Sequence, residues 1–161
     1  DLWVIDRDGA NRRQLTSTVG PENKPSWSPD GTQIAFEKGS SFGTNFDVFV
    51  IGADGTGQVN LTNDAIDERW PAWSPDGTQI AFSAGGVIQV VPAGGGPRVT
   101  LSTGPNDVRP QWSPDGSQLM FMRFSAGPTQ LVVTDADGTN PHFATGPSSE
   151  ANSFGWVQCP P

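Results

Sequence analysis

The chain has little of what catalytic and metal-binding sites are commonly built from. Its 161 residues include one cysteine, one histidine and no tyrosine. With Cys159 alone, neither an intrachain disulfide nor a cysteine cage for a metal can form. No apolar run approaches the roughly 18 residues that a membrane-spanning helix needs. We therefore expect neither a thiol-based site nor insertion into a membrane.

Positive charge is also scarce. Nine Lys and Arg stand against 17 Asp and Glu, which gives a formal net charge of −8. Nucleic acids are held chiefly by clustered basic side chains on their phosphates, and the sequence has no basic cluster. We expect no nucleic-acid partner.

Helix-forming stretches are missing as well. With 20 Gly and 15 Pro, the longest segment free of both is residues 58–70. Hydrophobic residues nevertheless make up 34% of the chain, which is enough for a core. This composition predicts a turn-rich, folded, all-β protein.

A block of twelve residues recurs three times, as Pro25–Phe36, Pro71–Phe82 and Pro110–Phe121. Each copy contains Trp-Ser-Pro-Asp-Gly followed by a short apolar strand. The tryptophans are 46 and 39 residues apart, and Trp156 follows 44 residues later in a degenerate fourth copy. Turn-bounded repeats of about 40–50 residues are typical of propeller blades.

The repeated Ser-Pro-Asp-Gly predicts a tight turn, because Pro suits its first corner and Gly its left-handed residue. We expect the turn aspartates to bond to their own backbone rather than to act in catalysis. Large aromatic residues that recur at one place in a repeat predict a core between blades. These residues are Asp30, Asp76 and Asp115 in the turns and Trp27, Trp73 and Trp112 before them.

Further strands are predicted at residues 46–51, 87–91 and 130–134, and outer strands at 59–62, 98–101 and 142–145. The predicted fold is an all-β β-propeller of four-stranded antiparallel blades, with three complete blades and partial blade strands at both ends. The repeat units are roughly 20–62, 66–103 and 106–145, and residues 1–17 and 150–161 supply the partial strands. Residues 1–161 thus form one propeller domain or a propeller segment.

The two ends together lack one strand of a fourth blade, so closure into a four-bladed ring is strained. Two hypotheses stay open. The chain is a segment of a larger propeller, or copies of it assemble so that open blade edges pair between chains.

These repeats resemble the WD-like, Pro-Asp type repeats of TolB-like β-propellers, over essentially the whole chain. The resemblance rests on the three Trp-Ser-Pro-Asp-Gly blocks and on the segment Leu2–Thr16. It implies a propeller that is periplasmic or extracellular and that binds a protein partner, as the TolB scaffold binds a lipoprotein. Similar propellers also precede the hydrolase domain of prolyl oligopeptidase-like enzymes.

Acidic residues precede each inner strand, where the loops of a propeller gather at one mouth of its channel. Glu22, Glu68 and Asp107 each lie five residues before their Trp, and Glu150 lies six before Trp156. Converging carboxylates suit Ca²⁺ or Mg²⁺, or a basic partner group. Two interpretations are open: a cation held by Glu22, Glu68 and Asp107, or a solvated acidic rim softened by Lys24, Arg69 and Arg109. The predicted partner-binding residues at this acidic mouth are Glu22, Asp67, Glu68, Arg69, Trp70, Asp107, Arg109 and Glu150.

No catalytic constellation is predicted. The segment Gly39–Gly43 matches the nucleophile pattern G-x-S-x-G, but it lies between two expected antiparallel strands and the only histidine, His142, is on an outer strand of another repeat. The predicted function is a non-catalytic scaffold for a protein or peptide partner. The alternatives are a gating propeller segment of a prolyl oligopeptidase-like serine hydrolase and a structural protein that assembles through its blade edges.

Overall fold

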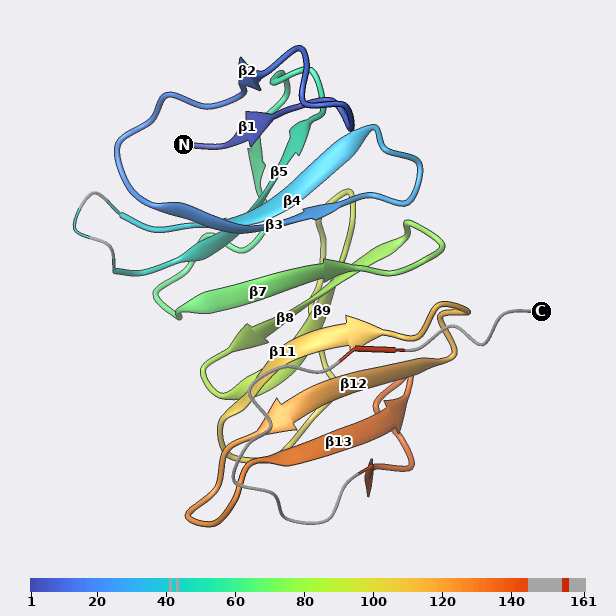
Figure 1. Cartoon of the computed structure of the whole chain (residues 1–161). Helices are drawn as coiled ribbons and strands as arrows, with labels where there is room; N and C mark the ends of the chain where they lie inside the picture. The colour runs from blue at the N-terminus through green and yellow to red at the C-terminus, as the bar shows by residue number, and fades with distance from the viewer. Residues whose placement is uncertain (41, 43, 145–154, 157–161) are drawn as a thin grey trace.

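The computed structural model describes residues 1–40, 42, 44–144 and 155–156. These residues form three four-stranded antiparallel sheets and one two-stranded ribbon, with no helix (Figure 1). The fold class is therefore all-β and propeller-like, as predicted. Because the described residues form no helix, none of them belongs to a helix that could cross a membrane.

Each sheet is a meander in chain order. The ribbon consists of β1 (Trp3–Val4) and β2 (Arg13–Gln14). The first blade consists of β3 (Glu22–Trp27), β4 (Gln33–Lys38), β5 (Asp47–Gly52) and β6 (Val59–Asn60). The second consists of β7 (Glu68–Trp73), β8 (Gln79–Ala84), β9 (Val87–Pro92) and β10 (Val99–Thr100). The third consists of β11 (Asp107–Trp112), β12 (Gln118–Arg123), β13 (Gln130–Asp135) and β14 (His142–Phe143).

The Ser-Pro-Asp-Gly turns join the first two strands of every blade. In the first blade, the Ser28 hydroxyl donates to Asp30 at 2.6 Å and the Thr32 amide donates to the same oxygen at 3.0 Å. Gly31 has φ of 69°, the left-handed conformation that glycine adopts without strain. In the third blade, the equivalent bonds from Ser113 and Ser117 lower the pKa of Asp115 to about 2. The predicted turn chemistry is confirmed.

The core lies between adjacent blades. Val48 and Val50 of the first blade form one buried cluster with Trp73, Ile80 and Phe82 of the second. A second cluster joins the second blade to the third in the same way. On the other face of the first blade, Leu2 next to the ribbon covers Ile34, Phe36 and Ile51. The second strands of the first two blades, β4 and β8, are therefore sandwiched between sheets, which is why their apolar side chains point in both directions.

Two of the tryptophans hydrogen-bond to the preceding inner strand. The Trp112 indole donates to the Ala72 carbonyl at 3.1 Å, and the Trp156 indole donates to the Gln111 carbonyl at 3.3 Å. Trp73 is buried between blades, whereas Trp27 is 48% exposed. The prediction of a core position is therefore wrong for Trp27. Within the described residues no inner strand precedes β3, so Trp27 has nothing to pack beneath.

The three blades follow one another along an open arc, with β3, β7 and β11 side by side along its inner side (Figure 1). The expected partial strands at the N-terminal end are present as β1 and β2. Of the segment 150–161, only Gly155 and Trp156 are among the described residues, and neither is in a strand.

Candidate functional site

Each inner strand contains a β-bulge near its middle. The pairing register shifts between Asn23 and Ser26 in β3, and at the equivalent places in β7 and β11. The bulged residues are Lys24, Trp70 and Arg109, with φ of 52°, 55° and 57°. Non-glycine residues seldom adopt this left-handed conformation, and when they do they are often at functional sites. Three equivalent residues of three blades therefore share one unusual backbone conformation.

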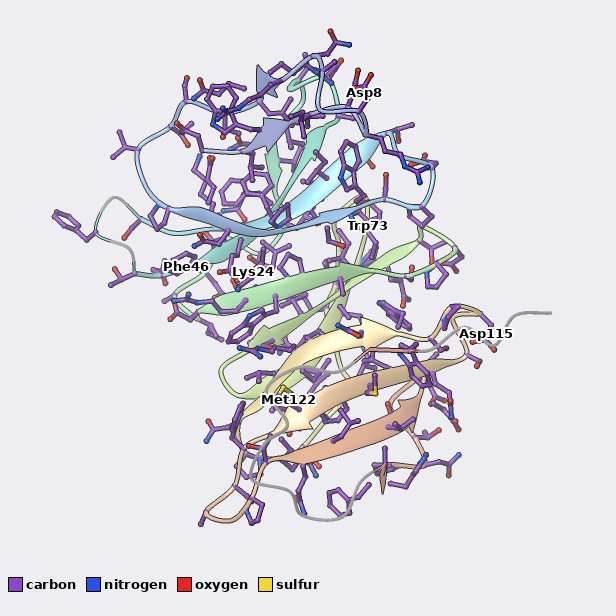
Figure 2. The ribbon with its side chains drawn as sticks, viewed as in Figure 1. Asp8, Lys24, Phe46, Trp73, Asp115 and Met122 are labelled. Atoms are coloured by element: carbon purple, nitrogen blue, oxygen red, sulfur yellow. The ribbon has the colours of Figure 1, made fainter. Side chains whose placement is uncertain are left out.

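A proline follows each bulged residue. Proline has no backbone N–H and so suits a strand with one unpaired edge. The inner strands are such strands, because each is the terminal strand of its sheet. The three strands together line a groove of about 500 Å³, which we call the inner groove. Figure 2 shows Lys24 between β3 and β7. The residues that line the inner groove are Lys24, Pro25, Ser26, Trp70, Pro71, Ala72, Arg109, Pro110 and Gln111.

The bulge of β7 is held from the preceding blade. The Trp70 amide donates to Glu37 Oε2 at 2.9 Å. Glu37 is buried on β4, and burial raises the pKa of its carboxyl group. Arg69 lies 3.8 Å from the same carboxylate and stacks 3.5 Å above the Phe46 ring. Arg109 in turn lies over the Trp70 ring at 5.7 Å. Trp70 is thus fixed on one side by Glu37 and faces a guanidinium on the other.

The acidic residues predicted to surround the channel are not on its surface. Glu22, Glu68 and Asp107 are all buried, the last two completely. In the first and third blades, the acid lies directly across the sheet from a cation: Glu22 pairs with Lys38, and Asp107 pairs with Arg123. Arg123 makes two bonds to Asp107, of 2.7 and 2.8 Å. These carboxylates tie strands together within a blade.

The second blade forms the same kind of pair with a different cation. The position across the sheet from Glu68 is occupied by Ala84. Arg98, just before β10, reaches Glu68 instead with an N–O distance of 2.9 Å and also bonds to the Thr62 carbonyl at 2.9 Å. Glu22 likewise accepts hydrogen bonds from Thr16 and Thr18. Each acid therefore has partners of its own.

The expected cation site is consequently not formed by Glu22, Glu68 and Asp107. Among the residues that the structure describes, no group of three His, Cys, Asp or Glu side chains is placed to hold a metal ion. Each of the three carboxylates is buried in its own blade and paired there with a different cation. Glu150 lies outside the described residues.

The remaining predicted partner-binding residues divide into two groups. Trp70 and Arg109 line the inner groove together. Asp67 is exposed directly before β7. Its carboxylate accepts a hydrogen bond from the Phe46 amide at 2.9 Å and lies 3.5 Å from the Arg69 guanidinium. Asp67 and Arg69 thus hold the loop before β7 against the first blade.

Glu68 gives the site a pH-dependent prediction. Burial raises the pKa of Glu68 to about 7, against the pull of Arg98. Between pH 4.5 and 7 the folded chain keeps a proton that the unfolded chain releases, so stability falls as the pH rises. From about pH 5 to pH 8, the wild type should lose about 2–3 kcal/mol of unfolding free energy relative to Glu68→Gln. Urea unfolding of both proteins across this range measures it, and parallel pH curves would contradict it.

The nucleophile position of the G-x-S-x-G pattern, Ser41, lies outside the described residues. The neighbouring Ser40 hydroxyl lies 3.1 Å from that of Thr44. His142 is on β14 of the third blade, whereas the pattern follows β4 of the first.

Lys24 lines the groove but was not among the predicted partner-binding residues. The missed signal is the dipeptide whose members lie three and two residues before each repeated tryptophan. It reads Lys24-Pro25, Trp70-Pro71 and Arg109-Pro110. A proline in an inner strand marks the channel edge, and the residue before it is the bulge that lines the groove.

The order of strands, the turns and the three repeats agree with one known sequence family. The profile of the TolB beta propeller domain matches residues 1–159. The chain belongs to this family. No curated protein matches it.

Solved propeller structures have the same fold. A putative TolB from Agrobacterium tumefaciens is 23% identical, with a TM-score of 0.79 over 88% of this chain and 55% of that one. TolB from Acinetobacter baumannii is 20% identical, with a TM-score of 0.57 over 89% and 48%. The β-propeller domain of the Trilobed protease from Pyrococcus furiosus is 16% identical, with a TM-score of 0.62 over 80% and 44%. The chain spans about half the length of these structures.

Proposed function

We propose that this chain is a non-catalytic scaffold that binds a protein or peptide partner in the inner groove. The observation that carries the proposal is the placement of Lys24, Trp70 and Arg109, one from each blade, along a single groove of about 500 Å³. This volume falls within the range of roughly 300–1,000 Å³ usual for ligand sites. The three inner strands, each part of a four-stranded sheet, hold the lining side chains in place before a partner arrives.

The chemistry of the lining supports binding rather than catalysis. Tryptophan and arginine are the residue types that contribute most to recognition at protein interfaces. The three prolines add rigid apolar surface that loses little entropy when it is covered. The only histidine, His142, is exposed on an outer strand and is not among the groove residues.

Blocking the groove tests the proposal. The bulky substitutions Ala72→Trp and Gln111→Trp should abolish the selection of peptides from a random-peptide phage library that the wild type selects. Thr100→Trp, on exposed β10 away from the groove, is the matched control and should leave the selected set unchanged. Recovery of the same peptides by the blocked variants, or of none by the wild type, would contradict a peptide-binding groove.

The remaining hypotheses stay predictions. Half-exposed Trp27 is compatible with both open hypotheses, a segment of a larger propeller and assembly through open blade edges, because its equivalents Trp73 and Trp112 are each covered by the preceding blade. A gating role beside a hydrolase domain is compatible with the likeness to a protease propeller, which shows the fold alone. A periplasmic or extracellular location follows from the family resemblance and is also a prediction.

A further inference from the structure

The inner groove is positively charged in a chain that is negative overall. Lys24 and Arg109 both line it, whereas none of its lining residues is an Asp or a Glu. The nearby Glu37 is buried, and its charge is engaged by the Trp70 amide and by Arg69. The sign of the groove is thus opposite to that of the whole chain, whose net charge is −8.

This local sign results from where the acids are placed. The carboxylates at the start of each inner strand, Glu22, Glu68 and Asp107, are turned into the blades and neutralised there by Lys38, Arg98 and Arg123. Two residues further along the strand, the bulge changes the direction in which the side chain points, so that Lys24, Trp70 or Arg109 lines the groove. Lys24 is exposed, and no described residue forms an ion pair with it within 4 Å.

We infer that the partner segment held in the inner groove is an acidic peptide, with a carboxylate beside Lys24 and an apolar or aromatic side chain against Trp70. This inference rests on the proposed function, since it names the class of ligand for the same groove. An extended peptide fits the lining, because the groove crosses three inner strands and its equivalent positions recur from one strand to the next. A basic peptide would meet Lys24 and Arg109 as like charges.

The composition of the selected phage peptides separates this inference from the proposed function. Acidic residues should be enriched in every groove-dependent peptide. Groove-dependent peptides without that enrichment would overturn the acidic class and leave a peptide-binding groove standing. A library that yields no groove-dependent peptide at all would overturn both.

A direct measurement uses fluorescein-labelled hexaglutamate, hexaglutamine and hexalysine in fluorescence anisotropy titrations. Hexaglutamate should bind at least about tenfold more tightly than the other two at low salt, and less tightly as salt is added. Lys24→Glu should remove that preference. Arg7→Glu, which makes the same change in charge on the exposed β1–β2 turn, is the matched control and should retain it.

Three results would overturn the inference. These are equal binding of the three probes, preference for hexalysine, and equal losses in Lys24→Glu and Arg7→Glu. The last would mean that hexaglutamate responds to the net charge of the chain and not to the groove. Circular dichroism of both variants checks that the sheets are intact.

Discussion

Replacing Phe82 by alanine is expected to lower the free energy of unfolding by about 3–5 kcal/mol, the usual cost of removing a buried phenylalanine. Phe82 is completely buried on β8 of the central blade. Its ring packs with Val48 and Val50 of the first blade and with Trp73. Close-packed sheets on both sides cannot collapse into the cavity, so the cost should lie at the upper end of this range. Urea unfolding followed by circular dichroism measures it.

Val59→Ala is the control for this substitution. Val59 lies on the outer strand β6 and is 53% exposed, so its truncation should change stability by less than about 0.5 kcal/mol. A loss below about 1 kcal/mol for Phe82→Ala would mean that the first two blades do not pack through this cluster.

Asp107→Ala is expected to cost about 3–5 kcal/mol, because it leaves the Arg123 guanidinium without its counter-charge in a largely buried position. Asp107 is fully buried, and it accepts both hydrogen bonds that Arg123 directs at it. The Gly104 backbone also closes over the guanidinium, so that a Cβ there would lie 2.1 Å from Arg123 Nε. Arg123 therefore has little room to move toward water.

A double-mutant cycle distinguishes the ion pair from general damage to β11. Arg123→Leu added to Asp107→Ala should restore much of the lost stability, since both charges are then absent. Additive losses in the double variant would show that the two side chains do not act as a pair.

Much of the fold was predictable from the repeated block alone. Ser-Pro-Asp-Gly sets the turn geometry locally, through bonds that span two residues, so Asp30 and Gly31 adopt the predicted roles without help from the rest of the chain. The strand after each turn has apolar residues on both faces, which predicted a sheet on either side, and β4 and β8 have one on each side. Local chemistry and repeat period together were sufficient for the architecture.

The candidate site could not be predicted in the same way, because it depends on which way side chains point. Glu22, Glu68 and Asp107 have the spacing of a converging ring, but spacing does not reveal that each faces into its own blade. That direction depends on a cation elsewhere in the chain: Arg98 is 30 residues after Glu68 and Arg123 is 16 after Asp107. The bulge in each inner strand then changes the direction in which its side chains point. The groove is therefore lined by Lys24, Trp70 and Arg109 and not by the acids.

Trp27 was misplaced for a related reason. Its repeat is indistinguishable from those of Trp73 and Trp112, yet burial requires a preceding inner strand that the described residues do not supply. A repeat pattern predicts how a unit contacts its neighbours and does not show whether a neighbour is there.

The indole bonds of Trp112 and Trp156 to the preceding inner strand also bear on how such genes change. The acceptor is a main-chain carbonyl, that of Ala72 in one case and of Gln111 in the other. Every residue has a backbone carbonyl, so this hydrogen bond does not depend on the side chain of the acceptor residue. At junctions of this kind, recombination that duplicates or deletes a whole repeat therefore requires no matching substitution at the acceptor residue.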